Sequence, residues 1–168
     1  MYLELLSQLR PDWVVMTRTG DGNRCFYIAT ICEMLGRGRV LSVQGEDRDN
    51  LPEHPRLDYL VGEPTDPSVV QEVEARVGGG RVVVFLGSRR RSLVVREFEA
   101  YAPLVPLGSY VVIEETVLNG HPAAPEHGAG PFEAVTAIMK ARRDFVPDPD
   151  FERHGLTFNP RGFLKRVE

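Results

Sequence analysis

Two adjacent carboxylates, Glu114 and Glu115, are the residues of this chain whose type and spacing best suit chemistry. They follow residues 109–113, an uncharged run of β-branched and aromatic residues that is typical of a strand buried on both faces. In open α/β sheets, ligands bind just beyond the carboxyl ends of the strands. Paired acids at such a place can hold a hard cation or move a proton, and the alternative is that they form the solvated end of a strand.

Two histidines, His121 and His127, lie in residues 116–130, a loop rich in glycine and proline that follows the two acids. Loops of this length in a compact domain are usually functional or disordered. Imidazole titrates near neutral pH, so either histidine can accept a proton from a hydroxyl group. Glu133 lies at the start of the next expected helix, where a favourable interaction with the helix dipole is enough to explain the presence of a carboxylate.

A second region with potential chemistry is the turn over residues 17–23, which contains Gly20 and Gly22 and precedes an expected helix. Glycines in the first turn of an α/β unit let a nucleotide approach the backbone and the helix N-terminus. The next strand ends at Gln44, followed closely by Glu46, where a side chain can bind ribose hydroxyls. Two glycines alone are a weak signal.

The elements that must position these residues alternate between strand and helix. This alternation predicts one α/β domain over residues 1–168, with a mostly parallel sheet covered by helices on both faces and a C-terminal antiparallel strand pair. The expected strands are 13–17, 39–43, 57–61, 81–86 and 109–113, with the terminal pair at 145–150 and 156–167. The expected helices are 1–10, 25–35, 66–77, a segment from just after the arginines at 89–91 to about 102, and 131–143.

Composition narrows the function classes. The chain has 168 residues, 42% hydrophobic and 26% charged, with a formal net charge of −4. The lack of a basic surplus argues against a nucleic-acid partner, and no apolar run is long enough to span a membrane. No signal peptide is evident, and Cys25 and Cys32 are expected to be reduced, so we predict a cytoplasmic protein.

Motifs along nearly the whole chain resemble the cephalosporin hydroxylase/rhamnosyl O-methyltransferase family. They are PDWVV, GDGNRCFYIATICEML, EAYAPLVPLGSY, SYVVIEETVLNGHP, GAGPFEAV and LTFNPRGFLKRV. The resemblance implies a Rossmann-like S-adenosylmethionine (SAM) methyltransferase sandwich with a reversed last strand. It also implies methyl transfer to a hydroxyl of a sugar or natural-product small molecule, assisted by Mg²⁺ or another divalent metal.

Residue roles follow from the same resemblance. Glu114 and Glu115 match the acidic pair of the family's metal site, and His121 in the NGHP motif is the best candidate for the base. Residues 116–130 would then form the active-site loop. The residues expected to contact SAM are Thr17, Gly20, Asp21, Gly22, Asn23, Gln44 and Glu46.

Four residues depart from the family pattern: Met16, Arg18, Gln44 and Gly87. Gly87 stands where a metal-binding Asp is expected, which would weaken the metal site. The alternative hypothesis is therefore a catalytically degenerate methyltransferase fold with a binding or assembly role. A third option is a site for an anionic ligand at Arg18 and the arginines 89–91. We also expect a homo-oligomer, joined through the apolar N-terminal helix.

Overall fold

The computed structural model describes all 168 residues and confirms the mixed α/β fold. Its seven-stranded sheet has the order β3-β2-β1-β4-β5-β7-β6. The chain divides into two compact units, Met1–Val84 and Phe85–Glu168, and their boundary falls within β4 (Val82–Leu86). That residues 1–168 form a single domain remains a prediction.

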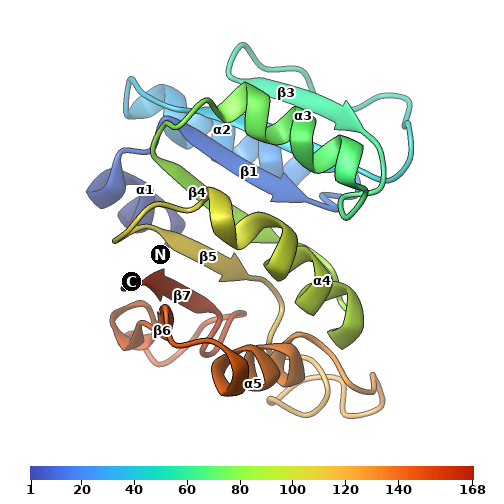
Figure 1. Ribbon diagram of the computed structural model, residues 1–168, viewed down its shortest axis with the longest axis vertical. Coiled ribbons are helices and arrows are strands. Elements are labelled where there is room, and N and C mark those ends of the chain that lie inside the picture. The colour runs from blue at the N-terminus through green and yellow to red at the C-terminus, as the bar shows by residue number, and fades with distance from the viewer. The chain divides into compact units, whose positions relative to one another are not determined.

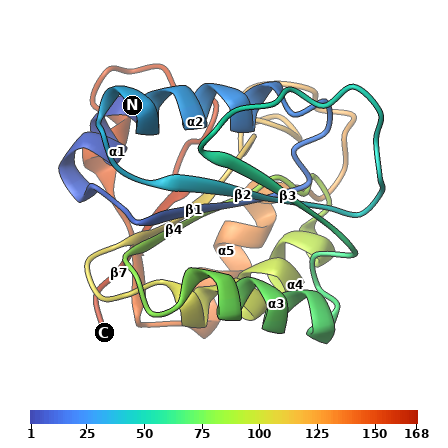
Figure 2. The same ribbon diagram turned by 90° about the horizontal axis from the view of Figure 1, so that it is seen from above.

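The first unit is built on parallel strands. β1 (Trp13–Thr17), β2 (Arg39–Gln44) and β3 (Leu57–Val61) are paired in parallel, with Trp13 opposite Arg39 and Val40 opposite Leu57. α2 (Asn23–Met34) covers one face of these strands and α3 (Pro67–Val77) covers the other (Figure 2). This is the expected arrangement, because parallel strands need crossover helices.

Local sequence explains where the helices of this unit begin and end. Asp66 caps α3 by accepting a hydrogen bond from Ser68 N at 3.0 Å, and Pro67 takes the first helical position. Gly78 ends the same helix in a left-handed conformation. The N-terminal helix α1 (Tyr2–Leu9) buries Leu5 and Leu6, as its apolar stripe predicts.

The second unit contains helices and an antiparallel extension of strands. Its helices are α4 (Arg91–Tyr101) and α5 (Pro131–Ala141), which pack on each other, and its short 3₁₀ helices are Ala102–Leu104 and Pro149–Glu152. Its strands are β5 (Tyr110–Ile113), β6 (Phe145–Pro147) and β7 (Phe163–Arg166). β7 is antiparallel to both β5 and β6, and lies beside β5 in Figure 1.

The terminal strand pair is confirmed, but both strands are shorter than predicted. Residues 148–150 leave the strand because proline lacks a donor for the ladder and Pro149 starts a 3₁₀ helix, for which the Asp148 side chain accepts from Asp150 N. Residues 156–162 lie outside the strand, with bends at 158–159, a turn at 160–161 and Arg161 in a left-handed conformation.

The central strands β4 and β5 are apolar throughout, as their sequences predict. Every residue of β4 and β5 is buried, and so are the inward-facing residues of α4 and α5. None of the helices combines the length and apolarity that a membrane span requires.

Candidate functional site

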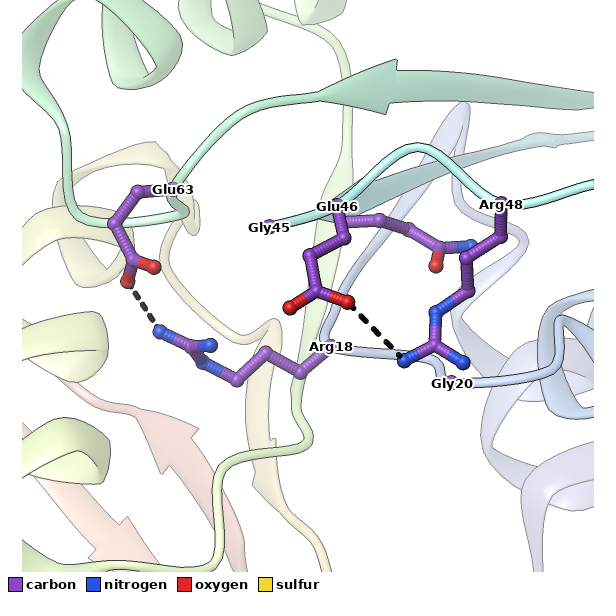
Figure 3. Close-up of a pocket in the computed structure, with 7 residues that line it drawn as sticks. Arg18, Gly20, Gly45, Glu46, Arg48 and Glu63 are labelled. Atoms are coloured by element: carbon purple, nitrogen blue, oxygen red, sulfur yellow. Dashed lines mark hydrogen bonds and ion pairs between the residues drawn. The ribbon is translucent and has the colours of Figure 1, made fainter.

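A polar cavity of about 220 Å³ opens in the first unit where β1 and β2 end. Three of the predicted cofactor residues, Gly20, Gln44 and Glu46, line it. The other lining residues are Arg18, Gly45, Arg48 and Glu63 (Figure 3). The carboxyl ends of parallel strands are where an α/β fold binds its ligand, so this cavity is the candidate cofactor site.

A buried hydrogen bond joins the two segments that form this cavity. The hydroxyls of Thr19 and Ser42 lie 2.7 Å apart, and both side chains are buried. Gln44 Nε2 also donates to Ser42 Oγ at 3.5 Å, and the Gln44 side chain is only 3% exposed. The first turn is therefore fixed to the end of β2, and the Gln44 amide has a defined position.

The charges around the cavity are paired. Arg18, in a left-handed conformation with φ of 49°, pairs with Glu63 from the segment after β3. Arg48 Nη2 lies 3.8 Å from Glu46 Oε2. Figure 3 shows the Arg18 side chain extending toward Glu63 and away from Arg48. The cavity thus offers carboxylates for hydroxyl groups and guanidinium groups for an anion.

The remaining predicted cofactor residues do not line this cavity. Thr17 is fully buried at the end of β1. Asp21 accepts hydrogen bonds from Asn23 N at 3.1 Å and Asn23 Nδ2 at 2.8 Å, and Gly22 is the N-cap of α2. These residues shape the turn, and their contact with a cofactor remains a prediction.

This set of groups fits the polar parts of SAM. Acceptor oxygens of Gln44 and Glu46 suit ribose hydroxyls, and the arginines suit a carboxylate. Gly20 leaves open space, since a Cβ atom there would have no neighbour within 4 Å.

In the second unit, Glu115 is held by an arginine. Arg89 Nη2 donates to Glu115 Oε1 at 2.8 Å, and Arg89 Nε donates to Glu115 Oε2, so both carboxylate oxygens are engaged. Hydrogen bonding to Glu115 raises the pKa of Arg89 above its ordinary value, and the guanidinium stays charged. The neighbouring Glu114 side chain is 3% exposed at the end of β5.

The residues present do not fit a resident divalent metal in this arrangement. The structure contains no group of three or more His, Cys, Asp or Glu side chains that could hold a metal ion. Gly87 contributes no ligand, and the oxygens of Glu115 face Arg89. Metal binding by Glu114 and Glu115 is thus a prediction from the sequence that these contacts do not support.

A clamp from the C-terminal segment, which sequence reasoning did not assign to the site, fixes the end of β5. Asn159 Oδ1 accepts from Glu115 N at 2.8 Å, and Thr116 Oγ1 donates to Pro160 O at 2.7 Å. Ile113 N donates to Gly162 O at 2.8 Å. The sequence NPRGF could have indicated this clamp, because Asn and Gly are the residue types that turns and close backbone approaches require.

His121 is held by Glu133 and Phe132 from the start of α5. Its Nε2 lies 2.9 Å from Glu133 Oε1, and its ring stacks on Phe132 with centroids 3.8 Å apart. His121 and these two residues line a second cavity of about 560 Å³, together with Arg91, Thr136, Ala137 and Lys140. His127, in contrast, is exposed, with its Nδ1 3.3 Å from the oxygen of the adjacent Gly128.

Glu133 does more than complement the helix dipole. Asn119 Nδ2 donates to its Oε1 at 2.9 Å, and Gly130 N donates to its Oε2 at 2.6 Å. Burial alone would raise the pKa of Glu133, but hydrogen bonds from Asn119, Gly130 and His121 outweigh it and lower the pKa to about 2. One carboxylate therefore anchors the loop 116–130 to α5.

We expect the Glu133→Gln variant to lose part of the acid sensitivity of folding. The folded-state pKa of about 2 lies below the ordinary value of 4.5, so Glu133 stabilises the fold above pH 4.5. This contribution of about 1 to 2 kcal/mol is lost as pH falls from 4.5 toward 2. Urea unfolding at pH values across this window measures it.

The exposed Glu126, in the same loop, provides the control as Glu126→Gln. If wild type and Glu133→Gln lose stability equally steeply below pH 4.5, the anchoring role of Glu133 is wrong.

Comparison with known proteins gives consistent similarities. The family model described as Rhamnosyl O-methyltransferase/CmcI matches residues 1–167. A curated rhamnosyl O-methyltransferase from Mycobacterium tuberculosis is 30% identical over 174 residues, which cover 98% of this chain and 71% of that protein.

Two solved structures show the same fold. A CmcI structure with Mg and SAM has a TM-score of 0.72 at 15% identity, covering 99% of this chain and 69% of that one. The methyltransferase MycE from the mycinamycin biosynthetic pathway, in complex with Mg, S-adenosylhomocysteine (SAH) and mycinamycin VI, has a TM-score of 0.61 at 19% identity. That match covers 83% of this chain and 40% of MycE. The SAM-methyltransferase fold implied by the sequence motifs is confirmed.

Proposed function

The chain belongs to the Rhamnosyl O-methyltransferase/CmcI family, and on this basis we propose that it transfers a methyl group from SAM to a small-molecule hydroxyl. The observation that carries the proposal is the polar cavity at the ends of β1 and β2, in a chain that matches this family over residues 1–167. The acceptor class we propose is a sugar or another natural product. The names of the relatives, a rhamnosyl transferase and an enzyme bound to mycinamycin VI, support it.

The cofactor would be held in the first unit. Gln44 and Glu46 would bind the ribose hydroxyls, and Arg18 would bind the carboxylate of the methionine part in exchange for Glu63. When bound, SAM supplies a methyl group activated by its attachment to a positively charged sulfur.

His121 is the base in this proposal. Glu133 is ionised and can only accept, so His121 Nε2 carries the proton and donates to it, which leaves the lone pair of the neutral ring on Nδ1. Nδ1 would accept the proton of the acceptor hydroxyl while the hydroxyl oxygen bonds to the methyl carbon that SAM would supply. The electron pair of the broken carbon–sulfur bond would remain on sulfur.

Calorimetric titration with SAH tests the cofactor site without knowledge of the acceptor. We expect saturable binding of SAH to the wild type. Gln44→Ala should bind SAH about tenfold more weakly, because the variant lacks the buried amide that would hydrogen-bond the ligand. The control is Gln71→Ala, which replaces an exposed glutamine of α3 outside the cavity. Equal affinity for all three proteins would contradict the proposed site.

A binding protein without catalysis is the second candidate, and the Arg18–Glu63 pair at the cavity favours it. In that case Arg18 closes the cofactor site. The wild type would then bind no SAH, whereas Arg18→Ala would gain affinity for it. Under the catalytic proposal the wild type binds SAH, and Arg18→Ala binds it more weakly.

The proposal includes a cytoplasmic location, which the two free and buried cysteines, Cys25 and Cys32, support. It also includes a homo-oligomeric state, a small-molecule acceptor and the absence of a nucleic-acid partner. Sedimentation analysis of the purified chain tests the oligomeric state.

A further inference from the structure

We propose that the Arg89 guanidinium takes the place of a divalent cation beside Glu115. In this proposal the end of β5 binds the acceptor hydroxyl without a metal ion. The role of this positive charge in catalysis rests on the proposed methyl transfer. The exclusion of a metal ion from Glu115 by Arg89 does not depend on that function, and it can be measured independently.

The first support is the geometry of the pair. Arg89 binds Glu115 through two parallel hydrogen bonds, the arrangement in which a guanidinium matches a carboxylate best. A divalent ion would need the same oxygens of Glu115. Cation and guanidinium therefore compete for one carboxylate.

The second support is how firmly Glu115 is presented to Arg89. The backbone N–H of Glu115 donates to the buried Asn159, and Glu115 itself has a φ of 57°, a left-handed conformation that non-glycine residues rarely adopt. The backbone of Arg89 is also close to its surroundings, because a Cβ atom on Gly130 would lie 3.3 Å from Arg89 O. The backbones of both partners are therefore held by the local fold.

The third support is the missing ligand on β4. The residue after this strand is Gly87, which has no side chain, and Ser88 is turned to the buried Glu97 with an Oγ–Oε1 distance of 2.6 Å. Neither residue after β4 supplies a carboxylate to a cation at Glu115. A metal would have two glutamates at most, and both oxygens of Glu115 are already bound to Arg89.

Arg89 also retains the means to bind an acceptor. A guanidinium has five N–H donors, and Glu115 uses two of them, one on Nε and one on Nη2. The Arg89 side chain is 65% exposed, so the remaining donors can reach a ligand oxygen. Such donors stabilise negative charge on an oxygen that loses its proton.

Titration with Mn²⁺, followed by calorimetry or electron paramagnetic resonance, tests the proposal. We expect the wild type to bind Mn²⁺ only weakly, with a dissociation constant that can be fitted only at high Mn²⁺ concentration. Arg89→Gln frees Glu115 and removes a repelling charge, and should strengthen Mn²⁺ binding on the order of tenfold. The double variant Gly87→Asp with Arg89→Gln offers three carboxylates and should bind a single Mn²⁺ ion.

Arg90→Gln is the matched control, because it removes the same charge from the adjacent, exposed residue, which has no bond to Glu115. Saturable Mn²⁺ binding by the wild type that Arg89→Gln leaves unchanged would overturn the proposal. Failure of the double variant to bind Mn²⁺ would overturn it as well, since Arg89 would then not be what excludes the ion.

SAH titration of the same samples separates this inference from the proposed function. Loss of SAH binding with the expected Mn²⁺ pattern would refute the cofactor proposal alone. SAH binding with a strong wild-type Mn²⁺ site would refute only the replacement of the metal. Once an acceptor is found, methyl transfer by the wild type should be unchanged by a chelator.

Discussion

Replacing Gly162 by alanine should lower the free energy of unfolding by about 3 kcal/mol, the largest loss that we expect from any single methyl group in the second unit. A Cβ atom at this position would lie 2.3 Å from Ile113 O, far inside contact distance. The obstructing atom belongs to the backbone of β5, where Ile113 N donates to Gly162 O. Relief of the clash must therefore separate β5 from the segment that leads into β7.

Chemical denaturation measures this loss as a shift in the urea midpoint at constant slope. Gly45→Ala is the control, because a Cβ atom there meets its nearest neighbour at 3.6 Å, an ordinary contact. A midpoint for Gly162→Ala close to that of the control would show that the segment moves aside at little cost.

Gly22→Ala is expected to have the second large effect, on both stability and cofactor binding. Gly22 has a φ of 80°, where alanine is strained, and a Cβ atom would lie 2.8 Å from Pro52 Cδ and 2.9 Å from Tyr59 Oη. Because Gly22 is the N-cap of α2, its displacement moves the turn that leads to the cofactor cavity. We expect a loss of about 2 to 3 kcal/mol in stability and of tenfold or more in SAH affinity.

Gly20→Ala provides the comparison within the same turn. Its φ of 67° imposes similar strain, but a Cβ atom would have no neighbour within 4 Å. Its stability should therefore fall by only about 1 kcal/mol. Thermal unfolding and SAH calorimetry on both variants measure the two effects, and equal losses of stability would contradict the role given to Pro52 and Tyr59.

The sequence predicted the elements best where a buried apolar run is bounded by turn residues. The strands at residues 13–17 and 57–61 were predicted with their observed bounds, and the helix predicted at 66–77 differs from α3 only by its N-cap residue Asp66. The C-terminal strands were overestimated, because residues 156–162 contain strand-forming types that the clamp around Asn159 holds in turns instead.

The candidate site was predictable only in part, since its main contacts join residues that are far apart in the chain. The Arg18–Glu63 pair spans 45 residues, and the Arg89–Glu115 pair spans 26. No local pattern indicates such pairs, although Arg18 was recognisable as a departure from the family motifs and Arg89 as one of three consecutive arginines. Glu133 was recognised only as a helix-dipole residue, because its bond to His121 depends on the path of the intervening loop.

The lining of the cofactor cavity has a consequence for how this protein can evolve. All its lining residues lie between positions 18 and 63, in the first unit, whereas Arg89, Glu115 and His121 all belong to the second. Substitutions of these three residues change none of the residues that line the candidate cofactor cavity. If the proposed cofactor site is correct, a lineage can change its acceptor or give up its metal while selection continues to maintain the residues that bind the methyl donor.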